Sequence, residues 1–543
     1  MKTVRSMVLV SSDPESIKRG SEELFAAFQK QLQQYDLSEE VFLTYASDIG
    51  HSNASPLVII YPEAVIYGPI QVEDVPLIVE EHLYKGRIVD GKIAPTYDLS
   101  GRVAWLNARK GTLPAENRIV LTNVGLIDPQ SIEDYIAHEG YQALGMALLM
   151  SPDEVIDTIK KSGLQGRGGA GFPTGLKWSF VRKASGEKKY VICNADESEP
   201  GTFKDRVILE GDPHRIIEGM LIAAYAVGAD EGFLYIRGEY QLAITRLETA
   251  IKQAEEYGFL GKNIFGSSLN FNLHVHAGAG AYICGEETAL IESLEGKRGE
   301  PRSRPPYPTN EGLWGKPTLI NNVETLANIA PIIKNGSAWF RKIGTPSSPG
   351  TKVYTILGNV NERGLIEVPM GITLREVISI YTKGMTSGHF KMAQTGGSGG
   401  SIIPSSLQDT PMDFESFKKA GVSLGSGALL ICNDDVCIVD LAKVLANFFR
   451  VECCGKCTPC RIGTQRAYEI LTNISEGRGT MQDLDNLRSI SNQLNELSNC
   501  GLGQTAGAPL RDALDHFRGE VEAHIRLKVC PTGVCPMSGT TLS

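Results

Sequence analysis

The chain has 543 residues, and its 53 Lys and Arg against 63 Asp and Glu give a formal net charge of −10. At about 150 residues per domain, this length predicts three or four domains. An acidic chain without a Lys/Arg run is a poor candidate for binding nucleic acid. No apolar run reaches the roughly 18 to 20 residues of a membrane span, and the amino-terminal apolar stretch is too short for a secretory signal. We therefore expect a cytoplasmic protein.

The first 85 residues alternate strand-like and helix-like segments. Strands are predicted at 7–10, 41–45 and 57–62, and helices at 14–35 and 72–83. Apolar residues at the period of each element support this assignment. The sequence predicts a small α/β domain over 1–85. Residues 86–150 are expected to form a polar linker that ends in a lead-in helix near 131–150.

The rest of the chain divides by composition into four further parts. Residues 151–340 are dense in glycine and predict an α/β domain, whereas 341–432 read as strand, turn, strand and helix, which predicts a β-grasp module. Residues 433–515 have helical periodicity and predict a helical bundle. Residues 516–543 form a cysteine-containing tail. The predicted fold class is therefore α/β multidomain.

Cysteine placement indicates a metal site. Two of the eleven cysteines stand alone before residue 300, and the other nine lie between 432 and 535. The segment CGKCTPCR places three thiols at spacings of three, and a fourth follows forty residues later in NCGLGQ. This pattern favours a 4Fe-4S cluster over zinc, because a Cys₄ zinc site more often pairs two C-x₂-C knuckles. The expected ligands are Cys454, Cys457, Cys460 and Cys500, with Cys453 pointing away.

The segment GRGGAGFPTGLKW, residues 166–178, has five glycines in thirteen residues. Backbone N–H groups in such a loop can approach a phosphate or a flat ring, while Arg167 and Lys177 supply positive charge. The segment has neither the G-K-[ST] ending of a phosphate loop nor the G-x-G-x-x-G fingerprint. Taken alone, it could also be an ordinary tight turn.

Three further segments also place polar side chains beside apolar or glycine-rich stretches. Carboxylates follow the strand-like YVIC in NADESEPGTFKDR, a second glycine-rich turn opens GAGAYICGEETAL, and INNVETLAN offers neutral hydrogen-bonding groups. A run of charged residues usually lies on a solvent-exposed face. Carboxylates beside a glycine loop can instead accept hydrogen bonds from the ribityl, ribose and carboxamide groups of a bound cofactor. The side chains singled out are Asp196, Glu197, Glu199, Tyr282, Glu286, Glu287, Asn321, Asn322 and Thr325.

These segments and CGKCTPCR occur in the order found in one family, which the chain resembles over roughly residues 118–510. The family is the NADH-oxidising FMN/4Fe-4S flavoprotein subunit of respiratory complex I and its soluble relatives. The resemblance is nearest to the beta subunit of electron-bifurcating hydrogenases, formate dehydrogenases and transhydrogenases. It implies hydride transfer from NADH to FMN and one-electron transfer to the 4Fe-4S cluster.

The resemblance also assigns residues by motif position. It implies FMN contacts from Gly166, Arg167, Gly168, Gly169, Asn194, Asp196, Tyr282, Gly285, Asn321, Asn322 and Thr325. The NAD(H) side would be lined by Glu197, Glu199, Glu286 and Glu287, with Phe172, Phe180 and Tyr307 placed for adenine stacking, and Lys177 would meet the phosphates of either NAD or FMN. Core packing is the alternative for each aromatic. Glu197, Glu199 and Tyr282 are the residues expected to act on the reaction.

The two ends of the chain depart from the pattern. Residues 1–85 resemble a thioredoxin-like 2Fe-2S domain, but VSSDPES and ASDIGHSNASP stand where ligands would be expected, so a cluster-free docking domain is predicted. Relatives can end in a ferredoxin-like domain, and none is expected within these 543 residues. In the tail, a Cys₃His zinc site could form from Cys437, Cys530 and Cys535 with His524, or less favourably His516. Buried thiols, or thiols contacting a partner, are the alternatives.

The expected function is that of the NAD(H)- and FMN-binding subunit of a soluble, electron-bifurcating complex. It would link NAD(H) to ferredoxin, as external carrier, and to a third couple, either hydrogen, formate or NADPH. The expected partners are a 2Fe-2S small subunit and a multi-cluster catalytic subunit. NAD is preferred over NADP, because an acidic pocket would repel a 2′-phosphate. The rivals are the respiratory complex I subunit and a non-catalytic electron-relay subunit.

Overall fold

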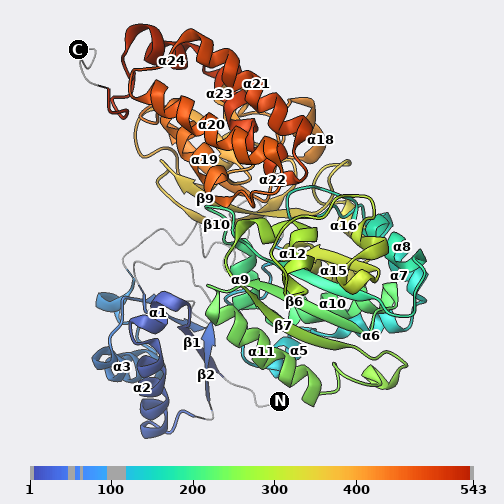
Figure 1. Cartoon of the computed structure of the whole chain (residues 1–543). Helices are drawn as coiled ribbons and strands as arrows, with labels where there is room; N and C mark the ends of the chain where they lie inside the picture. The colour runs from blue at the N-terminus through green and yellow to red at the C-terminus, as the bar shows by residue number, and fades with distance from the viewer. Residues whose placement is uncertain (1–4, 39, 47–54, 62–64, 95–117, 538–543) are drawn as a thin grey trace.

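The structure is a computed structural model, and it describes residues 5–38, 40–46, 55–61, 65–94 and 118–537. Most of the segment ASDIGHSNASP, the linker residues 95–117 and the last six residues lie outside the described residues. Figure 1 shows the amino-terminal part (blue), the glycine-rich part (green) and the carboxyl-terminal helices (red) as three bodies in contact.

The amino-terminal part is a four-stranded mixed sheet in the order β2-β1-β3-β4. The strands β1 and β2 pair in parallel, and β3 and β4 continue the sheet antiparallel. The predicted helix over 14–35 is interrupted at Gly20, whose φ of +94° ends α1 before α2 begins. The elements are β1 (Ser6–Ser11), α1 (Pro14–Lys18), α2 (Ser21–Gln34), β2 (Val41–Ala46), β3 (Val58–Tyr61), β4 (Val65–Tyr67), η2 (Val72–Asp74), α3 (Val75–Ile78), η3 (Val79–Tyr84) and η4 (Asp90–Lys92).

The predicted lead-in helix near 131–150 is two helices, α5 (Ile132–Ala137) and α6 (Gln142–Leu148). Between them Glu139 and Tyr141 adopt positive φ. A Cβ on Gly140 would lie 2.1 Å from the Tyr135 ring, so only glycine allows this tight reversal. The expectation of one continuous helix was wrong for this reason.

The glycine-rich part is built on a parallel sheet in the order β7-β6-β5-β8. The chain steps outward from β5 to β7 and then returns to the other side of β5, so the order reverses between β5 and β8. The carboxyl ends of strands at such a reversal are where open α/β sheets bind ligands. The strands are β5 (Tyr190–Ala195), β6 (Glu231–Arg237), β7 (Asn272–Gly278) and β8 (Thr318–Asn322).

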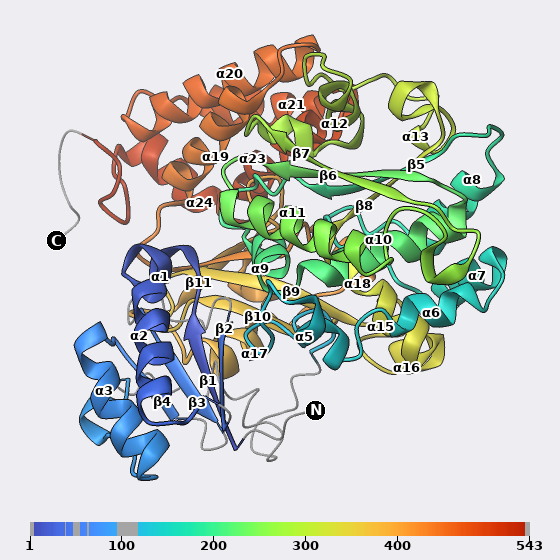
Figure 2. The ribbon, with the colours of Figure 1, turned by 90° about the horizontal axis from the view of Figure 1, so that it is seen from below.

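Helices cover this sheet on both faces (Figure 2). The helix α10 is nearly all buried and forms the centre of the largest hydrophobic core. The helices are α7 (Pro152–Ser162), α8 (Thr174–Lys183), α9 (Lys204–Gly211), α10 (Pro213–Val227), α11 (Gln241–Glu256), α12 (Glu287–Leu294), α13 (Pro308–Glu311), α14 (Val323–Ala327), α15 (Ile329–Asn335) and α16 (Ser337–Arg341), with the short turns η6 (Ile264–Gly266), η7 (Tyr282–Gly285) and η8 (Leu313–Gly315).

A five-stranded mixed sheet follows, in the order β10-β9-β13-β11-β12. Its first and last strands, β9 and β13, pair in parallel at the centre, which is the arrangement of a β-grasp sheet. The elements are β9 (Thr351–Gly358), β10 (Gly364–Pro369), α17 (Leu374–Glu376), η9 (Val377–Tyr381), β11 (Phe390–Thr395), β12 (Ile402–Pro404), η10 (Ser405–Leu407), α18 (Phe414–Lys419) and β13 (Ala428–Asn433).

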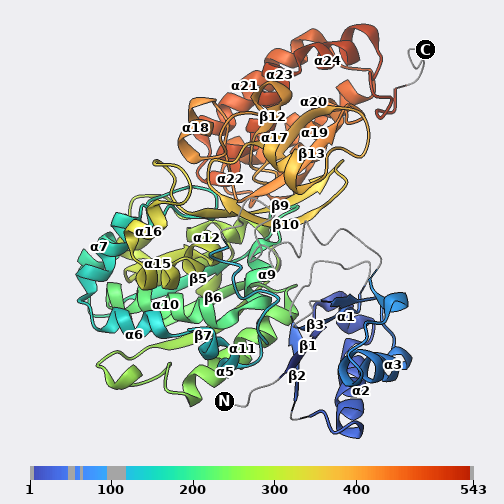
Figure 3. The ribbon, with the colours of Figure 1, turned by 180° about the vertical axis from the view of Figure 1, so that it is seen from behind.

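The carboxyl-terminal part is helical, as its periodicity predicts. Its core is continuous with residues of the parallel-sheet part, including Tyr235, Ile283 and Leu290. Figure 3 shows these helices above the five-stranded sheet. They are α19 (Ile438–Glu452), α20 (Thr458–Ser475), α21 (Met481–Leu497), α22 (Gly501–Ala506), α23 (Ala508–His516), α24 (Arg518–Glu522) and η11 (Ala523–Leu527).

The amino-terminal part is fixed to the parallel-sheet part by a buried arginine. Arg246 on α11 donates to the Ser12 carbonyl at 2.9 Å, to the Ser12 hydroxyl at 2.8 Å and to the Glu210 carbonyl at 2.6 Å. Thr44 on β2 donates to Asp128 at 3.0 Å. Buried charged hydrogen bonds of this kind hold two bodies in one orientation.

Candidate functional site

Two asparagines mark the reversal point of the parallel sheet. Asn194 is the penultimate residue of β5 and pairs in register with Asn322, which ends β8. The Asn194 amide donates to the Gly285 carbonyl at 2.8 Å. Asn322 accepts from the Glu324 backbone at 3.0 Å and donates to Asp205 at 2.7 Å. These two side chains therefore tie together the acidic segment, the turn η7 and the start of α14.

The glycine loop lies against the same point. The Arg167 N–H donates to the Thr325 hydroxyl at 2.8 Å. A Cβ on Gly168 would lie 3.2 Å from Cβ of Asn322, and Gly169 has a φ of +121°. The loop therefore brings its backbone to within van der Waals contact of the end of β8, as a cradle for a phosphate or a flat ring requires.

The structure corrects the expected role of the Arg167 charge. Its guanidinium is fully buried and donates to the carbonyls of Gln165, Pro349 and Thr351 at 3.2, 2.8 and 3.1 Å. These bonds hold the loop to the start of β9, so the charge does not face a phosphate. Thr325 is fully buried too. Both side chains hold the loop in place.

Asn321 also has a partner within the protein. Its Oδ1 accepts from the Trp178 indole at 2.9 Å, which connects β8 to α8. Asn321 and Trp178 are both buried. The asparagine is thus oriented by the protein, with its Nδ2 remaining for a further acceptor.

Asp196 fits a cofactor hydroxyl. Its side chain is buried, and its Oδ1 has no hydrogen-bond partner. Burial raises the pKa of Asp196 to about 7. A buried carboxylate oxygen without a donor is costly, and a ribityl hydroxyl is a donor of suitable chemistry. The donor set at the ends of β5 and β8 therefore fits FMN.

Glu199 and Tyr282 form a pair across the site. The Tyr282 hydroxyl donates to Glu199 at 2.6 Å, and the Gly399 N–H donates to the other carboxylate oxygen at 3.2 Å. Burial raises the pKa of Glu199 to about 7 even though these hydrogen bonds favour its charged form. The pair is placed to respond to a change of charge at the site.

The Glu197 carboxylate bonds to the start of α9, which corrects its expected role on the NAD(H) side. Its carboxylate accepts from the backbone N–H groups of Asp205 and Arg206 at 2.9 and 3.0 Å. It thereby caps the first turn of α9, where unpaired N–H groups favour a carboxylate. Glu197 stabilises this helix rather than facing a dinucleotide.

A stability measurement over pH tests the environment of Glu199. Between its ordinary pKa of 4.5 and its folded value of about 7, the folded state keeps a proton that the unfolded state loses. The free energy of unfolding should therefore fall as pH rises through this window, by about 3 kcal/mol from this group alone. We expect Glu199→Gln to remove this pH-dependent part of the free energy of unfolding. The Tm of the variant should then exceed that of the parent, by a difference that grows from pH 5 to pH 8. Equal slopes for the two proteins, with exposed Glu255→Gln as control, would contradict this.

The expected NAD(H) side carries two cations with its carboxylates. Lys177 lies 2.8 Å from Glu287 and donates to the Ile320 carbonyl at 2.9 Å. Arg304 lies 3.0 Å from Glu286 and 3.1 Å from Glu287. Arg304 was not among the residues predicted from the sequence, although it stands three residues before Tyr307 in RSRPPYP.

The three aromatics proposed to stack on adenine are open to solvent. Phe172 and Phe180 are each 45% exposed and Tyr307 is 55% exposed, which argues against core packing. Gly285 and Glu286 follow Tyr282 in and after η7, and Glu286 caps α12 through the Thr288 and Ala289 N–H groups. A dinucleotide could approach from this side without unpacking a core.

The four predicted cluster cysteines come from two places in the helical part. Cys454 and Cys457 lie between α19 and α20, Cys460 lies in α20, and Cys500 precedes α22. A Cβ on Gly503 would lie 3.1 Å from Cβ of Cys460, so the two segments touch. Burial raises the pKa of Cys500, and the nearby Cys454 thiol adds to the shift. Thiols brought together from two segments in this way fit a 4Fe-4S cluster.

Cys453 does not point away as expected. Its sulfur accepts from the Gly455 N–H at 3.4 Å, and its interaction with the neighbouring Cys460 thiol lowers its pKa to about 6. The thiol of Cys453 thus lies beside the cluster ligands.

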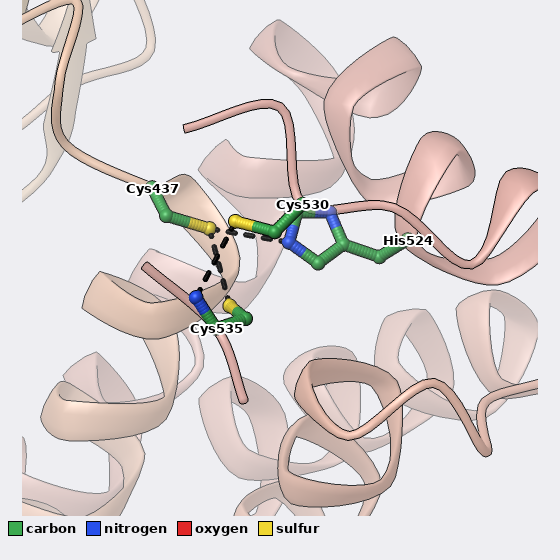
Figure 4. A group of neighbouring side chains, drawn as sticks. All are labelled: Cys437, His524, Cys530 and Cys535. Atoms are coloured by element: carbon green, nitrogen blue, oxygen red, sulfur yellow. Dashed lines mark hydrogen bonds between the residues drawn. The ribbon is translucent and has the colours of Figure 1, made fainter. Parts of the chain in front are cut away.

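The two cysteines of the tail, Cys530 and Cys535, lie beside His524 and Cys437 in a second buried group of metal-ligating side chains (Figure 4). Cys437 Sγ lies 3.3 Å from His524 Nε2 and 3.6 Å from Cys535 Sγ, and the Cys535 N–H donates to Cys530 Sγ at 3.5 Å. All four ligand atoms lie within 4.8 Å of one another. His524 Nδ1 bonds the Glu520 carbonyl at 2.8 Å, which leaves Nε2 facing the thiols. The donor set fits tetrahedral zinc, and His516 is not part of it.

The fold and the site define a flavin and iron–sulfur oxidoreductase subunit, and comparisons agree. The Nuo51 FMN-binding domain matches residues 159–331, and the NADH-ubiquinone oxidoreductase-F iron-sulfur binding region matches residues 440–524. Among the described residues no helix combines the length and apolarity needed to cross a bilayer.

Individual relatives extend the match over most of the chain. The NADP-reducing hydrogenase subunit HndC of Solidesulfovibrio fructosivorans is 52% identical over 77% of this chain and 85% of its own length. An NADH-quinone oxidoreductase subunit of Rhizobium meliloti is 50% identical over 76% of this chain and 99% of its own. A chain of an NAD⁺-reducing [NiFe]-hydrogenase in the H₂-reduced state superposes with a TM-score of 0.67 at 32% identity, over 96% of this chain and 86% of the other. The chain belongs to the family of NADH-oxidising FMN/4Fe-4S flavoprotein subunits of respiratory complex I and its hydrogenase-type relatives.

Proposed function

We propose that the chain is the NAD(H)- and FMN-binding subunit of an electron-bifurcating complex, which links NAD(H) to ferredoxin and to hydrogen, formate or NADPH. One observation carries the flavin-to-cluster part of this proposal. Tyr282, on the flavin side, donates its N–H to Glu452 at 3.2 Å and packs its ring on Phe448, 4.9 Å between centroids. Glu452 stands two residues before Cys454, the first cluster ligand, so this contact joins the flavin side to the start of the cluster loop.

Each part of the site then has a role in binding or orientation. FMN, when bound, supplies hydride acceptance and the release of electrons one at a time. The backbone of Gly166–Gly169 binds its phosphate, and Asp196 and Asn194 orient its hydroxyls. The pair of Glu199 and Tyr282 shapes the electrostatics at its ring. These assignments rest on the contacts described above.

The NAD(H) side is assigned to the opposite group of residues. Lys177 and Arg304 bind the pyrophosphate, with the exposed aromatics stacking on adenine. Glu286 and Glu287 favour NAD over NADP, because their carboxylates would repel a 2′-phosphate and already neutralise Arg304.

The remaining parts are assigned to assembly. We infer a division into a thioredoxin-like docking domain, an FMN/NAD(H) domain, a β-grasp domain and a helical 4Fe-4S domain, which rests on the three sheets and the helical end. A 2Fe-2S small subunit and a multi-cluster catalytic subunit are the proposed partners, with ferredoxin as external carrier. The hydrogenase-type relatives support this choice.

Anaerobic purification with the native partners tests the proposed function. We expect NADH oxidation only when ferredoxin and a second acceptor are both present, and the co-purified catalytic subunit identifies the third couple. If the protein co-purifies with membrane subunits and NADH reduces quinone at full rate, it is instead a respiratory subunit. The 50% identity to the Rhizobium meliloti oxidoreductase subunit supports this second candidate. A complex that keeps its cluster and FMN but never oxidises NADH would identify an electron relay.

The Cys₃His group gives a separate prediction about zinc. Changing Cys437, Cys530 and Cys535 to serine should remove one zinc per chain, because a structural site needs its thiolates. Metal analysis of the purified variant checks this, with iron content as the internal control. Zinc retained in full by the triple variant would mean that these thiols are only buried.

A further inference from the structure

A short segment connects the dinucleotide side to the cluster loop. We call residues 298–304 the strap. Arg298 donates to the Cys454 carbonyl at 3.0 Å, and the Pro301 carbonyl accepts from Lys456 at 2.7 Å. One end of the strap is therefore bonded to the loop that carries the first cluster cysteines.

The other end of the strap is bonded to α12. The Arg302 N–H donates to the Thr288 hydroxyl at 2.9 Å, and Arg304 pairs with Glu286 and Glu287. In the middle, a Cβ on Gly299 would lie 2.5 Å from Cys284 Sγ. The strap thus lies against the turn that carries Tyr282, and a side chain at position 299 would meet Cys284.

Two arginines donate to backbone carbonyls of the cluster loop, and a lysine of the loop donates to the strap. Besides Arg298 and Lys456, Arg461 donates to the Gly455 carbonyl at 2.6 Å. Within the strap, Arg298 also pairs with Glu300 at 3.1 Å, so Lys456 and Arg461 supply most of the positive charge beside the loop. A cluster gains negative charge when it is reduced, and net charge and hydrogen bonding around it set its reduction potential.

We propose that the strap, Lys456 and Arg461 form an electrostatic clamp that positions the cluster loop and raises the reduction potential of the 4Fe-4S cluster. The clamp favours the arrival of an electron from the flavin side. This inference rests on the proposed function, in that Cys454, Cys457, Cys460 and Cys500 hold the cluster. Arg298 and Arg461 bond to carbonyls of the loop, and Lys456 bonds the loop to the strap, so all three are positioning residues.

A potentiometric titration followed by EPR tests the clamp in the full-length, cluster-loaded chain. For Lys456→Gln we expect about a tenfold fall in the ratio of reduced to oxidised cluster at a fixed applied potential, which is 59 mV for a one-electron couple. Lys456→Arg keeps the charge and should titrate close to the parent. Arg466→Gln removes an exposed, ion-paired charge from α20 without touching the loop and should leave the potential unchanged.

The outcomes separate the clamp from the proposed function. Parent and Lys456→Gln proteins that hold full iron and titrate at the same potential would overturn the clamp. Loss of the cluster in Lys456→Gln but not in Lys456→Arg would support positioning, and Arg298→Gln then reports the effect on potential. If the parent chain itself gives no 4Fe-4S signal after reconstitution, the proposed function fails instead.

Discussion

Replacing Cys500 by serine is expected to remove the iron–sulfur cluster and leave the flavin-binding part intact. Cys500 is buried and supplies the fourth thiol from a segment forty residues beyond Cys460. A hydroxyl cannot replace a thiolate as an iron ligand of similar strength. Iron and acid-labile sulfide should fall from about four per chain to below one. FMN content should stay near that of the parent, because the glycine loop and the strand ends lie in another part of the chain.

The control for this variant is Cys432→Ser. Cys432 is also buried, but it lies in β13 and belongs to neither cysteine group. Its substitution should leave iron and zinc unchanged. If Cys500→Ser retained four irons, another group would have to complete the site, and the Cys453 thiol beside Cys460 would be the candidate.

The site could be predicted from the sequence where polar residues follow apolar strand-like runs. NADESEPG follows YVIC, and INN ends its own strand, so both segments meet at one edge of a parallel sheet. The reversal of strand order at β5 and β8 explains why this edge binds a ligand. The cysteine spacing was equally informative, because a turn with three thiols has few other uses.

The direction of individual side chains could not be predicted. Arg167 and Glu197 lie in motifs that suggest ligand contact. In the structure, however, Arg167 donates to a backbone carbonyl of β9, and Glu197 accepts from backbone N–H groups of α9. These partners are distant in sequence or depend on where a helix begins. Arg304 was missed because only the fold brings its loop to Glu286 and Glu287.

Breaks within helices could not be predicted from the sequence either. Periodicity continues through Gly20 and Gly140, but Gly20 has a φ of +94° and Gly140 lies against Tyr135 in a tight reversal, so each helix breaks there. Similarly, the sequence favours His524 as the zinc ligand but leaves His516 open as a less favoured alternative. Only His524 lies with Cys437, because the turn η11 returns to the start of α19.

A buried charge network connects the site to the five-stranded sheet. Glu324 on α14 lies 2.6 Å from Lys352 on β9 and 3.1 Å from Lys204 on α9, and it accepts from the Val353 N–H at 2.9 Å. All three charged side chains are almost fully buried. Burial alone would raise the pKa of Glu324, but the two lysines outweigh it and hold that pKa below its ordinary value.

The largest loss of stability is therefore expected from Glu324→Gln. Removing one partner of a buried ion pair costs about 3–5 kcal/mol, because the remaining charge stays buried without its counterion. The pKa of Lys352 is already lowered to about 8 by burial and would fall further without the carboxylate. We expect the Tm of the transition that includes the parallel sheet to fall by roughly 6–12 °C. Differential scanning calorimetry measures this, with Glu415→Gln, an exposed pair with Lys419, as a control that changes little.

The same variant should also release FMN more readily, and this links the network to function. Glu324 donates its N–H to Asn322, and Asn322 in turn bonds Asp205, which pairs with Lys204. Loss of the Glu324 charge therefore loosens the asparagine at the end of β8 and the glycine loop that rests on it. Dialysis against flavin-free buffer should remove FMN from Glu324→Gln faster than from the parent at a temperature where both remain folded. Unchanged retention with a lowered Tm would mean that the network stabilises the interface with β9 without orienting the flavin side.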